Sequence, residues 1–411
     1  MSSLCLHFKV HQPFYLRRYL AKESYECSCY EHVEAERDVI DKIADECYLP
    51  ANALMHDLIE KHPGNFKISY SISGTTLELL LKYRPDVVNS FQQLAETGCV
   101  EMLGETFYHS FSYLRSAKEF QRQVNKHSGL IDELFALKPV VFCNTELIYD
   151  NDLAKAVSSL GFEGILCEGV QKLLAGRTPN KLYSAPGVQN NLSLLLRNVR
   201  LSDDIAFRFG NPLWDGHPLT ASTFAKWINA HPQDTEVINL FMDYETFGIH
   251  KKQESGIFDF LQALPGHILG DTPFSFNTPS AVIKRYSSTG TYDIQNTISW
   301  EDSSKDDCVW SENVMQNNAL QKIYSLEKIV LKSNDERIKD IWGRLQSADY
   351  FYYMADGSNR ENGFQNLKPY KTPKEAFKYY MNIITDFEIS LIEKELKKTS
   401  RHQLMPAALF Y

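Results

Sequence analysis

Two acidic residues, Glu146 and Asp243, stand where apolar, strand-like runs of this chain give way to polar sequence. Glu146 lies within segment 140–149 and Asp243 within segment 237–248, and the two acids are 97 residues apart. In a barrel of parallel strands, the carboxyl ends of the strands open onto one face, so these two carboxyl groups can converge there. A converging pair of carboxyls is typical of glycoside hydrolysis, in which one group attacks or stabilises the sugar cation and the other transfers the proton.

Polar residues follow other strand-like runs as well. His11 follows the first run, His109 lies beyond the third, and Glu245 lies two residues past Asp243. Any one of these would be an ordinary capping or surface residue, but polar side chains from four strands at one rim predict an active site. Glu101 lies inside a run rather than at its end, and we interpret it as structural.

Short β-type runs alternate with amphipathic segments over roughly the first 290 residues, and this alternation predicts parallel βα units. About seven such units favour an α/β fold, an incomplete (β/α)7 TIM-like barrel. An open doubly wound sheet is less consistent with the sequence, because no GxGxxG or GxxxxGK[ST] phosphate loop follows an early strand. The expected strands are 4–10, 66–72, 99–103, 139–143, 162–166, 192–196 and 236–242, and the expected helices include 51–61, 86–96, 118–137 and 152–160.

The last quarter of the chain has a helical pattern alone. Apolar residues recur at spacings of three and four in segments 318–332 and 373–398, as they do on one face of a helix. Thr372 and Glu375 form a capping-box pattern around Pro373, a residue that suits the first helical position. These segments predict a C-terminal helical bundle.

The patterns together predict two domains, a (β/α)7 catalytic barrel over residues 1–310 and a helical bundle over residues 311–411 that packs on the barrel. Segment 169–191 shows no clear period, and we expect a long loop there. We find no internal repeat and no low-complexity tract.

The composition excludes several classes of protein. The chain has 411 residues, 43% of them hydrophobic, and a formal net charge of −9, with no block of five or more like charges. That balance argues against nucleic acid or an anionic membrane as a partner. No apolar stretch reaches the ~18 residues of a membrane span, and the N-terminus is too short and polar for a signal sequence. We therefore expect a cytoplasmic protein.

The eight cysteines contain no CxxC pair, and several fall in apolar runs where a small hydrophobic side chain fits. We interpret them as reduced thiols. Cys27 and Cys29 form a lone CxC without a second ligand pair, so no metal is assigned to them. Because two carboxyls suffice for glycoside hydrolysis, the sequence predicts neither a metal nor another cofactor.

Several segments, in the same order, resemble the motifs of glycoside hydrolase family 57, a family of α-amylase-like enzymes. The resemblance runs from the first strand to about residue 354. It implies the fold of that family, a (β/α)7 barrel followed by a helical bundle. It rests on His11-Gln12-Pro13, segment 98–110, Asn144-Thr145-Glu146, segment 242–248, and segment 299–302 with Trp310, Asn313, Met315 and Gln316.

The resemblance also implies roles. Glu146 matches the catalytic nucleophile, Asp243 the general acid/base, and Asp349 an acid that the helical part delivers to the active site. The implied substrate is an α-1,4-glucan or a maltooligosaccharide, cleaved with retention through a covalent glycosyl-enzyme. Asn144 and Thr145 depart from the pattern, since many members carry an aromatic residue or alanine there, so details of the subsites are not carried over.

A retaining glycosidase needs one carboxyl ionised and the other protonated. We expect burial among aromatic residues to raise the pKa of Asp243, and donors such as His11 or Asn144 to keep Glu146 ionised.

Sugar binding is expected from His11 and His109, and from two further residues. Trp300 offers a flat apolar face to a glucose ring. Glu245 shares a face with Asp243 in extended backbone, where it could repel the ionised form of that acid or bond a sugar hydroxyl.

Other functions stay open at this point. A 4-α-glucanotransferase or a branching enzyme would use the same site, with a sugar hydroxyl in place of water. A metal-dependent polysaccharide deacetylase would need His7 and His11 as ligands, yet residues i and i+4 lie ~13 Å apart along a strand. A non-catalytic glucan-binding protein would not need both carboxyls. The oligomeric state is also open.

Overall fold

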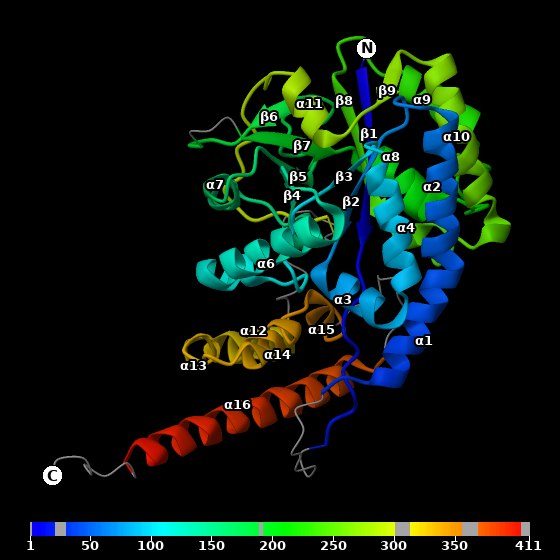
Figure 1. The fold of residues 1–411 in the computed structure, drawn as a ribbon. Helices are drawn as coiled ribbons and strands as arrows, with labels where there is room; N and C mark the ends of the chain where they lie inside the picture. Colours follow the sequence, from blue (N-terminus) through cyan, green and yellow to red (C-terminus); the bar gives the residue numbers. More distant parts are fainter. Residues whose placement is uncertain (1, 21–29, 189–191, 301–312, 356–368, 404–411) are drawn as a thin grey trace. The chain divides into compact units, whose positions relative to one another are not determined.

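The computed structural model describes residues 2–20, 30–188, 192–300, 313–355 and 369–403 (Figure 1). These residues form two compact units. The first unit contains the described residues of 1–13 and 37–308, and the second contains those of 14–36, 309–359 and 368–411. The second unit thus includes an early segment of the chain that the sequence did not assign to it. The predicted boundaries, 1–310 and 311–411, stay predictions.

Seven parallel strands form the centre of the first unit, in the order β3-β2-β1-β8-β7-β5-β4. Their residues are almost all buried, as expected when both faces of a parallel sheet are covered. Each strand corresponds to one of the seven predicted runs, and the predicted barrel-type α/β fold is confirmed. The strands are β1 (Ser2–Val10), β2 (Ile68–Ile72), β3 (Val100–Met102), β4 (Val141–Cys143), β5 (Gly164–Glu168), β7 (Ser193–Arg197) and β8 (Val237–Asp243).

The two edges of this sheet meet through a single residue, Gly104, just beyond β3. Its N–H donates to the carbonyl of Val141 at 2.9 Å, and its carbonyl accepts from the N–H of Cys143 at 2.7 Å. A Cβ atom at Gly104 would lie 2.5 Å from the ring of Phe162. Because glycine has no Cβ atom, the backbone of Gly104 can lie close to the ring of Phe162 and form the hydrogen bonds that join β3 to β4.

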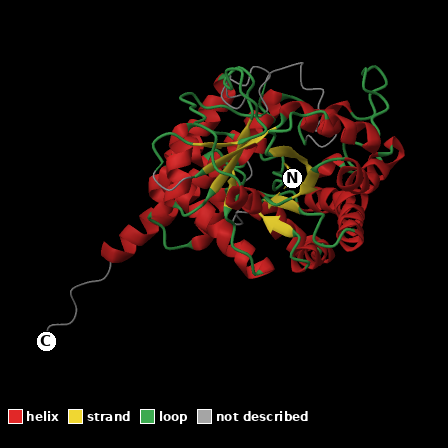
Figure 2. Ribbon diagram, turned by 90° about the horizontal axis from the view of Figure 1, so that it is seen from above, coloured by secondary structure: helices red, strands yellow, loops and turns green. Residues whose placement is uncertain are grey.

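Helices surround the strands of the first unit, and Figure 2 shows the strands inside them. The predicted helices 51–61, 86–96, 118–137 and 152–160 are present as α2, α4, α6 and α7. The helices are α2 (Leu49–Lys61), α3 (Gly74–Tyr83), α4 (Pro85–Glu96), α5 (Ser112–Arg115), α6 (Ala117–Phe135), α7 (Asn151–Ser159), α8 (Val199–Asp203), α9 (Ala221–Asn229), α10 (Ile257–Asp271) and α11 (Pro279–Arg285), and α1 (Val33–Ile43) has residues in both units.

Two short strands were not predicted. β6 (Leu182–Ser184) pairs antiparallel with β7, and β9 (Phe274–Phe276) pairs parallel with β1. The prediction of a long loop over 169–191 was therefore wrong for β6. Neither strand lies in a longer apolar run such as those around β3 and β4, which also have three residues but were recognised from the sequence.

The second unit is helical, as predicted. The expected helix 318–332 is interrupted at Leu326, whereas the expected helix 373–398 is continuous. The indole N–H of the buried Trp342 donates to the carbonyl of Ile323 at 2.9 Å and so fixes two of the helices together. Among the described helices, none is long and apolar enough to cross a lipid bilayer. The helices are α12 (Val314–Ser325), α13 (Glu327–Leu331), α14 (Glu336–Arg344), α15 (Ala348–Tyr352) and α16 (Pro373–Gln403).

Gly104→Ala is expected to lower the free energy of unfolding by about 1–3 kcal/mol, because the added methyl group would overpack the junction of β3 and β4. Urea denaturation measures the change. Gly266→Ala is the matched control, because Gly266 lies in α10 with open space where a Cβ atom would be. Alanine favours the interior of a helix by about 0.5–1 kcal/mol, so the control should be neutral or more stable. Equal effects of the two substitutions would contradict the role given to Gly104.

Candidate active site

Glu146 follows β4 in a short 3₁₀ turn, Thr145–Leu147, and has a left-handed backbone conformation with φ 55° and ψ 27°. Leu147 is also left-handed, with φ 49°. Such conformations cost about 1–3 kcal/mol for residues other than glycine, so surrounding contacts must hold them. The carbonyl of Glu146 accepts from the backbone N–H of Trp300 at 3.2 Å and from the hydroxyl of Ser299 at 2.9 Å.

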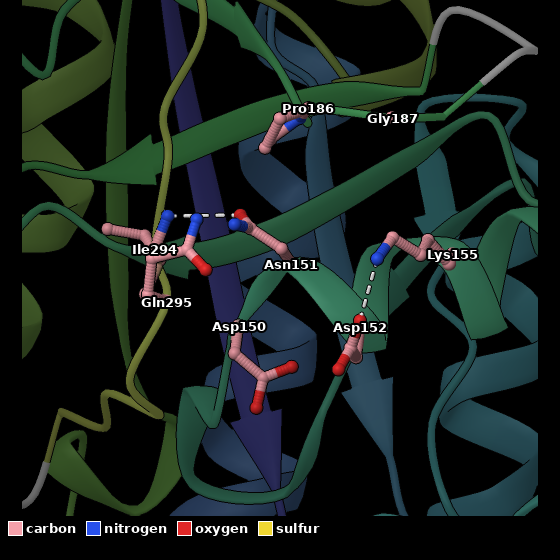
Figure 3. Close-up of a pocket in the computed structure, with 8 residues that line it drawn as sticks. All are labelled: Asp150, Asn151, Asp152, Lys155, Pro186, Gly187, Ile294 and Gln295. Carbon is pink, nitrogen blue, oxygen red and sulfur yellow. Dashed lines mark hydrogen bonds and ion pairs between the residues drawn. The ribbon is translucent and has the colours of Figure 1, made fainter.

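These contacts belong to a clasp between segments 146–151 and 294–300. The backbones of Tyr149 and Ile298 exchange two hydrogen bonds, of 3.0 and 2.9 Å. Asn151 donates its backbone N–H to the carbonyl of Ile294 and accepts from the Ile294 N–H with its side-chain oxygen, both at 3.0 Å (Figure 3). The clasp fixes the backbone on which Glu146 stands, from a segment about 150 residues later in the chain.

A cavity of about 280 Å³ lies against this clasp, at the beginning of α7. The side chain of Lys155 donates to Asp152 at 2.8 Å (Figure 3). Asp150 accepts from the N–H of Leu153 and the hydroxyl of Thr297. These polar groups are thus bonded within the protein, in keeping with a structural role for this region.

Two side chains donate hydrogen bonds to the carboxylate of Glu146. Nε2 of His109 lies 2.7 Å from Oε1, and the indole N–H of Trp300 lies 2.7 Å from Oε2. The sequence predicted His11 or Asn144 as donors. The amide of Asn144 instead donates to the carbonyl of Ile148 at 3.1 Å.

His11 lies beside these groups. Its ring stacks against that of His109 with 4.0 Å between centroids, and its Nδ1 is 2.7 Å from the hydroxyl of Ser73. His11, His109, Glu146 and Trp300, all chosen from the sequence, are therefore brought together.

Trp300 has a position that the sequence did not predict. Its ring packs against Phe241 of β8 at 5.2 Å and against the guanidinium of the buried Arg197 at 5.3 Å, while its N–H is used by Glu146. Trp300 thus joins Glu146 to the end of β8. Its expected stacking on a glucose ring stays a prediction.

Asp243 is the last residue of β8 and is half-buried, opposite Lys9 in the register of β1. Glu245, two residues on, is buried, and it accepts hydrogen bonds from the hydroxyl of Tyr48 and from the amide of Gln12 at 3.3 Å. Burial raises the pKa of Glu245, and these hydrogen bonds oppose that rise only in part.

The fully buried Tyr244 fixes the turn between Asp243 and Glu245. Its hydroxyl donates to Asn52 at 2.7 Å and accepts from the hydroxyl of Tyr70 at 3.1 Å.

Lys9 and Glu105 were not chosen from the sequence. Both are buried, they form an ion pair, and Glu105 lies 3.8 Å from Nδ1 of His109. Lys9 could have been recognised from the sequence, because it lies inside an otherwise apolar run, where a charged side chain needs a partner.

The remaining candidates belong to the second unit or lie outside the described residues. Asp349 belongs to α15 of the second unit, where the hydroxyl of Ser347 donates to it at 2.7 Å, and its role in the active site stays a prediction. Trp310, Cys27 and Cys29 lie outside the described residues.

His7 does not have the surroundings of a metal ligand. Its ring nitrogens lie 2.6 Å from the hydroxyl of Ser69 and 3.2 Å from Oδ1 of Asn239, and burial lowers its pKa to about 4. His7 is a core histidine with both nitrogens occupied, which removes the ligand pair that a deacetylase would need.

One surface group could approach a metal ion in the part of the chain that the structure describes. His56, Asp57 and Glu60 of α2 have ligand atoms within 4.8 Å of one another and are largely exposed. Exposed acidic groups commonly gather in this way without a metal, and we assign no site there.

Tyr48→Phe removes a donor from the buried Glu245 and should lower the free energy of unfolding by about 1.5–3 kcal/mol at pH 7. The pKa of Glu245 in the folded protein is raised, so the folded protein loses stability as the pH rises above the ordinary pKa of glutamate. Loss of the Tyr48 hydroxyl should raise the pKa of Glu245 further. The loss should therefore shrink toward pH 4, where the carboxyl is protonated in both states.

Tyr183→Phe is the control for that variant, because Tyr183 donates at 2.6 Å to the uncharged carbonyl of Thr178. Urea denaturation at several pH values measures both. A loss in Tyr48→Phe that does not vary with pH would contradict the role of Tyr48.

Comparison with known proteins agrees with the family resemblance. A family model described as Glycosyl hydrolase family 57 matches residues 5–295. A protein of Methanocaldococcus jannaschii named "Putative alpha-amylase" is 36% identical, over 97% of this chain and 88% of the relative.

Solved structures share the fold. A 4-alpha-glucanotransferase from Thermococcus litoralis has a TM-score of 0.70 at 13% identity, over 93% of this chain, which spans 59% of the length of that protein. A branching enzyme from Thermococcus kodakaraensis has a TM-score of 0.66 at 11% identity, over 94% of this chain and 89% of that one. With the family model matched over residues 5–295 and a relative 36% identical along nearly its whole length, this chain belongs to glycosyl hydrolase family 57.

Proposed function

We propose that this chain is a retaining glycosidase of the α-amylase type, which cleaves α-1,4-glucans or maltooligosaccharides by double displacement. The observation that carries the proposal is the carboxylate of Glu146, held between His109 and Trp300 at the end of β4. The name of the 36% identical relative supports the choice of substrate.

In the first step, Glu146 is the nucleophile and Asp243 the acid. An oxygen of Glu146 attacks the anomeric carbon as Asp243 gives its proton to the glycosidic oxygen. The bond from the anomeric carbon to that oxygen breaks, and its electron pair stays on the departing sugar. The donors to Glu146 fix the direction of its carboxylate before the substrate arrives.

In the second step, Asp243 acts as the base. It takes a proton from water as the water oxygen attacks the anomeric carbon. The bond to Glu146 breaks, and its electron pair returns to the carboxylate. The product keeps the α configuration because the carbon has been inverted twice.

The other candidates have supporting roles in this proposal. His11, Glu245 and Trp300 bind the sugar. The barrel, residues 1–310, carries the chemistry, and residues 311–411 form the helical bundle that includes Asp349. The five described cysteines are free and buried, which supports a cytoplasmic location.

A transferase is the second candidate. The structural neighbours named as a 4-alpha-glucanotransferase and as a branching enzyme favour it, since they share the fold. A sugar hydroxyl would replace water in the second step, with the same two carboxyls.

Glu146→Gln and Asp243→Asn should fail in different ways. Glu146→Gln should turn over every substrate at less than about a thousandth of the normal rate, because the amide cannot attack. Asp243→Asn should slow glucan cleavage by about 10²–10⁴-fold, yet still form a glycosyl-enzyme from α-maltosyl fluoride, whose leaving group needs little protonation. Intact-protein mass spectrometry detects the adduct. An adduct in Glu146→Gln, or equal losses on both substrates in Asp243→Asn, would contradict these roles.

The α-anomer should be the first product formed from a maltooligosaccharide, and activity should survive dialysis against a chelator. A proton NMR time course on maltoheptaose, with and without chelator, measures both. Shorter oligosaccharides alone would identify a hydrolase, whereas a ladder that extends above seven glucose units would identify a transferase. Initial β-anomer would exclude double displacement.

A further inference from the structure

Four buried or half-buried groups of alternating charge run from β1 to Glu146. The ammonium of Lys9 pairs with the carboxylate of Glu105, which lies 3.8 Å from Nδ1 of His109, whose Nε2 lies 2.7 Å from Oε1 of Glu146. Lys9, Glu105 and His109 are exposed by 6%, 0% and 4%. At such burial each charge is screened little by solvent, so each strongly affects the protonation of the next.

A buried ion pair contributes little to the net stability of a fold. Removing two charges from water costs several kcal/mol per ion, and apolar residues of similar volume are often as stable. Glu105 is nevertheless held firmly, since the hydroxyl of Ser71 donates to its other oxygen at 2.8 Å. A pair of this kind next to a catalytic group suggests a role in that group's chemistry.

We propose that Glu105 is a positioning residue that holds His109 as a cation facing Glu146, and that this cation assists the departure of Glu146 from the glycosyl-enzyme. The inference rests on the proposed role of Glu146 as nucleophile. Glu105 supplies the negative charge that His109 needs, and the ion pair with Lys9 fixes the position of the Glu105 carboxylate.

The charges around the two groups are consistent with this assignment. Burial alone would raise the pKa of Glu105, but the charge of Lys9 and the imidazole of His109 hold it well below the usual value. Burial and Lys9 both oppose the charge of His109, yet the carboxylates of Glu105 and Glu146 outweigh them and raise its pKa. Both shifts favour the charged form of the group concerned.

The two neighbouring histidines, His127 and His11, have other hydrogen-bond partners than Glu146. His127 of α6 accepts from the N–H of Glu105 with Nδ1 at 3.4 Å and donates from Nε2 to the carbonyl of Ile72 at 2.8 Å, which is the pattern of a neutral ring. Burial lowers its pKa. His11 stacks on His109 and faces the hydroxyl of Ser73. Among the described contacts of Glu146, His109 is the donor that can carry charge.

The charge acts mainly in the second half of the reaction. When water attacks the anomeric carbon, the bond to Glu146 breaks and a full negative charge returns to the carboxylate. A cation already placed at Oε1 stabilises that charge as it develops, without reorganisation of solvent. In the first half the same cation keeps Glu146 ionised but makes it a weaker nucleophile, so its benefit is greatest where Glu146 is the leaving group.

The first test measures the protonation of His109 in the free protein by ¹⁵N NMR of labelled histidines. In the wild type the ring should be charged at pH 7. Glu105→Gln should make it titrate at lower pH, because Lys9 remains and the carboxylate is lost. Lys9→Met should move the titration in the opposite direction. A general loosening of the core would move both variants the same way.

The second test measures the glycosyl-enzyme. With α-maltosyl fluoride, Glu105→Gln should show a burst of fluoride followed by a steady rate about 10- to 100-fold below that of the wild type, with a lower KM, because breakdown of the adduct becomes limiting. Glu101→Gln is the matched control. Glu101 is a half-buried carboxyl on β3 that accepts from the N–H and hydroxyl of Ser280 at 3.0 and 2.7 Å, and this variant should show no burst.

The outcomes separate this inference from the proposed function. A neutral His109 at pH 7 in the wild type overturns the inference without any variant, and so does a Glu105→Gln enzyme that loses kcat and kcat/KM equally without a burst. Full activity of Glu146→Gln would instead overturn the proposed function, while the NMR titration would still report on the charges around His109.

Discussion

The position of the Glu146 carboxylate depends on contacts of two kinds. Its backbone is left-handed, and the clasp from segment 294–300 holds it there. Its two oxygens accept from His109 and Trp300, which come from segments 37 residues before and 154 residues after it. In its proposed role as nucleophile, a carboxylate fixed in both backbone and side chain loses little freedom when substrate binds, and so more of the binding energy remains for the reaction.

The arrangement of the first unit brings together the residues that fix Glu146. β3 and β4 must be adjacent for His109 and Glu146 to meet, and they are joined through Gly104. Trp300 must reach back across the strand ends, where Phe241 of β8 and Arg197 of β7 support its ring. The barrel thus serves less to enclose a space than to bring charged and aromatic groups from separate strands to one carboxylate.

The sequence predicted the parts of the fold that depend on local pattern. Seven apolar runs form the seven parallel strands, because strands that are buried on both faces consist of nearly continuous apolar residues. β6 and β9 were missed because neither lies in a longer apolar run, and the interruption at Leu326 was missed because no glycine or proline marks it.

In the site, Glu146 and Asp243 could be chosen because both stand at strand ends. The amide of Asn144, predicted as a donor to Glu146, bonds elsewhere, and Trp300 was not predicted as a donor because it approaches Glu146 only through the long-range clasp. Lys9 was missed because a charged residue within a run is usually interpreted as facing solvent, and Glu105 was not chosen although it lies just beyond the predicted strand 99–103. Their pairing depends on the order of the strands, in which β2 lies between β1 and β3, and periodicity alone does not give that order.

The electrostatics around Glu146 and the choice between hydrolysis and transfer are separate properties of this enzyme. In the proposed mechanism, water and a sugar hydroxyl attack the same anomeric carbon, and both displace the carboxylate of Glu146. A charge on His109 would therefore accelerate both reactions alike, because it acts on the leaving group and not on the attacking one. The ratio of the two products depends on which acceptor can reach the carbon, and that is set by loops at the strand ends. A substitution at Glu105 should accordingly change how long the glycosyl-enzyme survives without changing the proportion of hydrolysis to transfer, whereas a substitution in an acceptor loop should do the reverse.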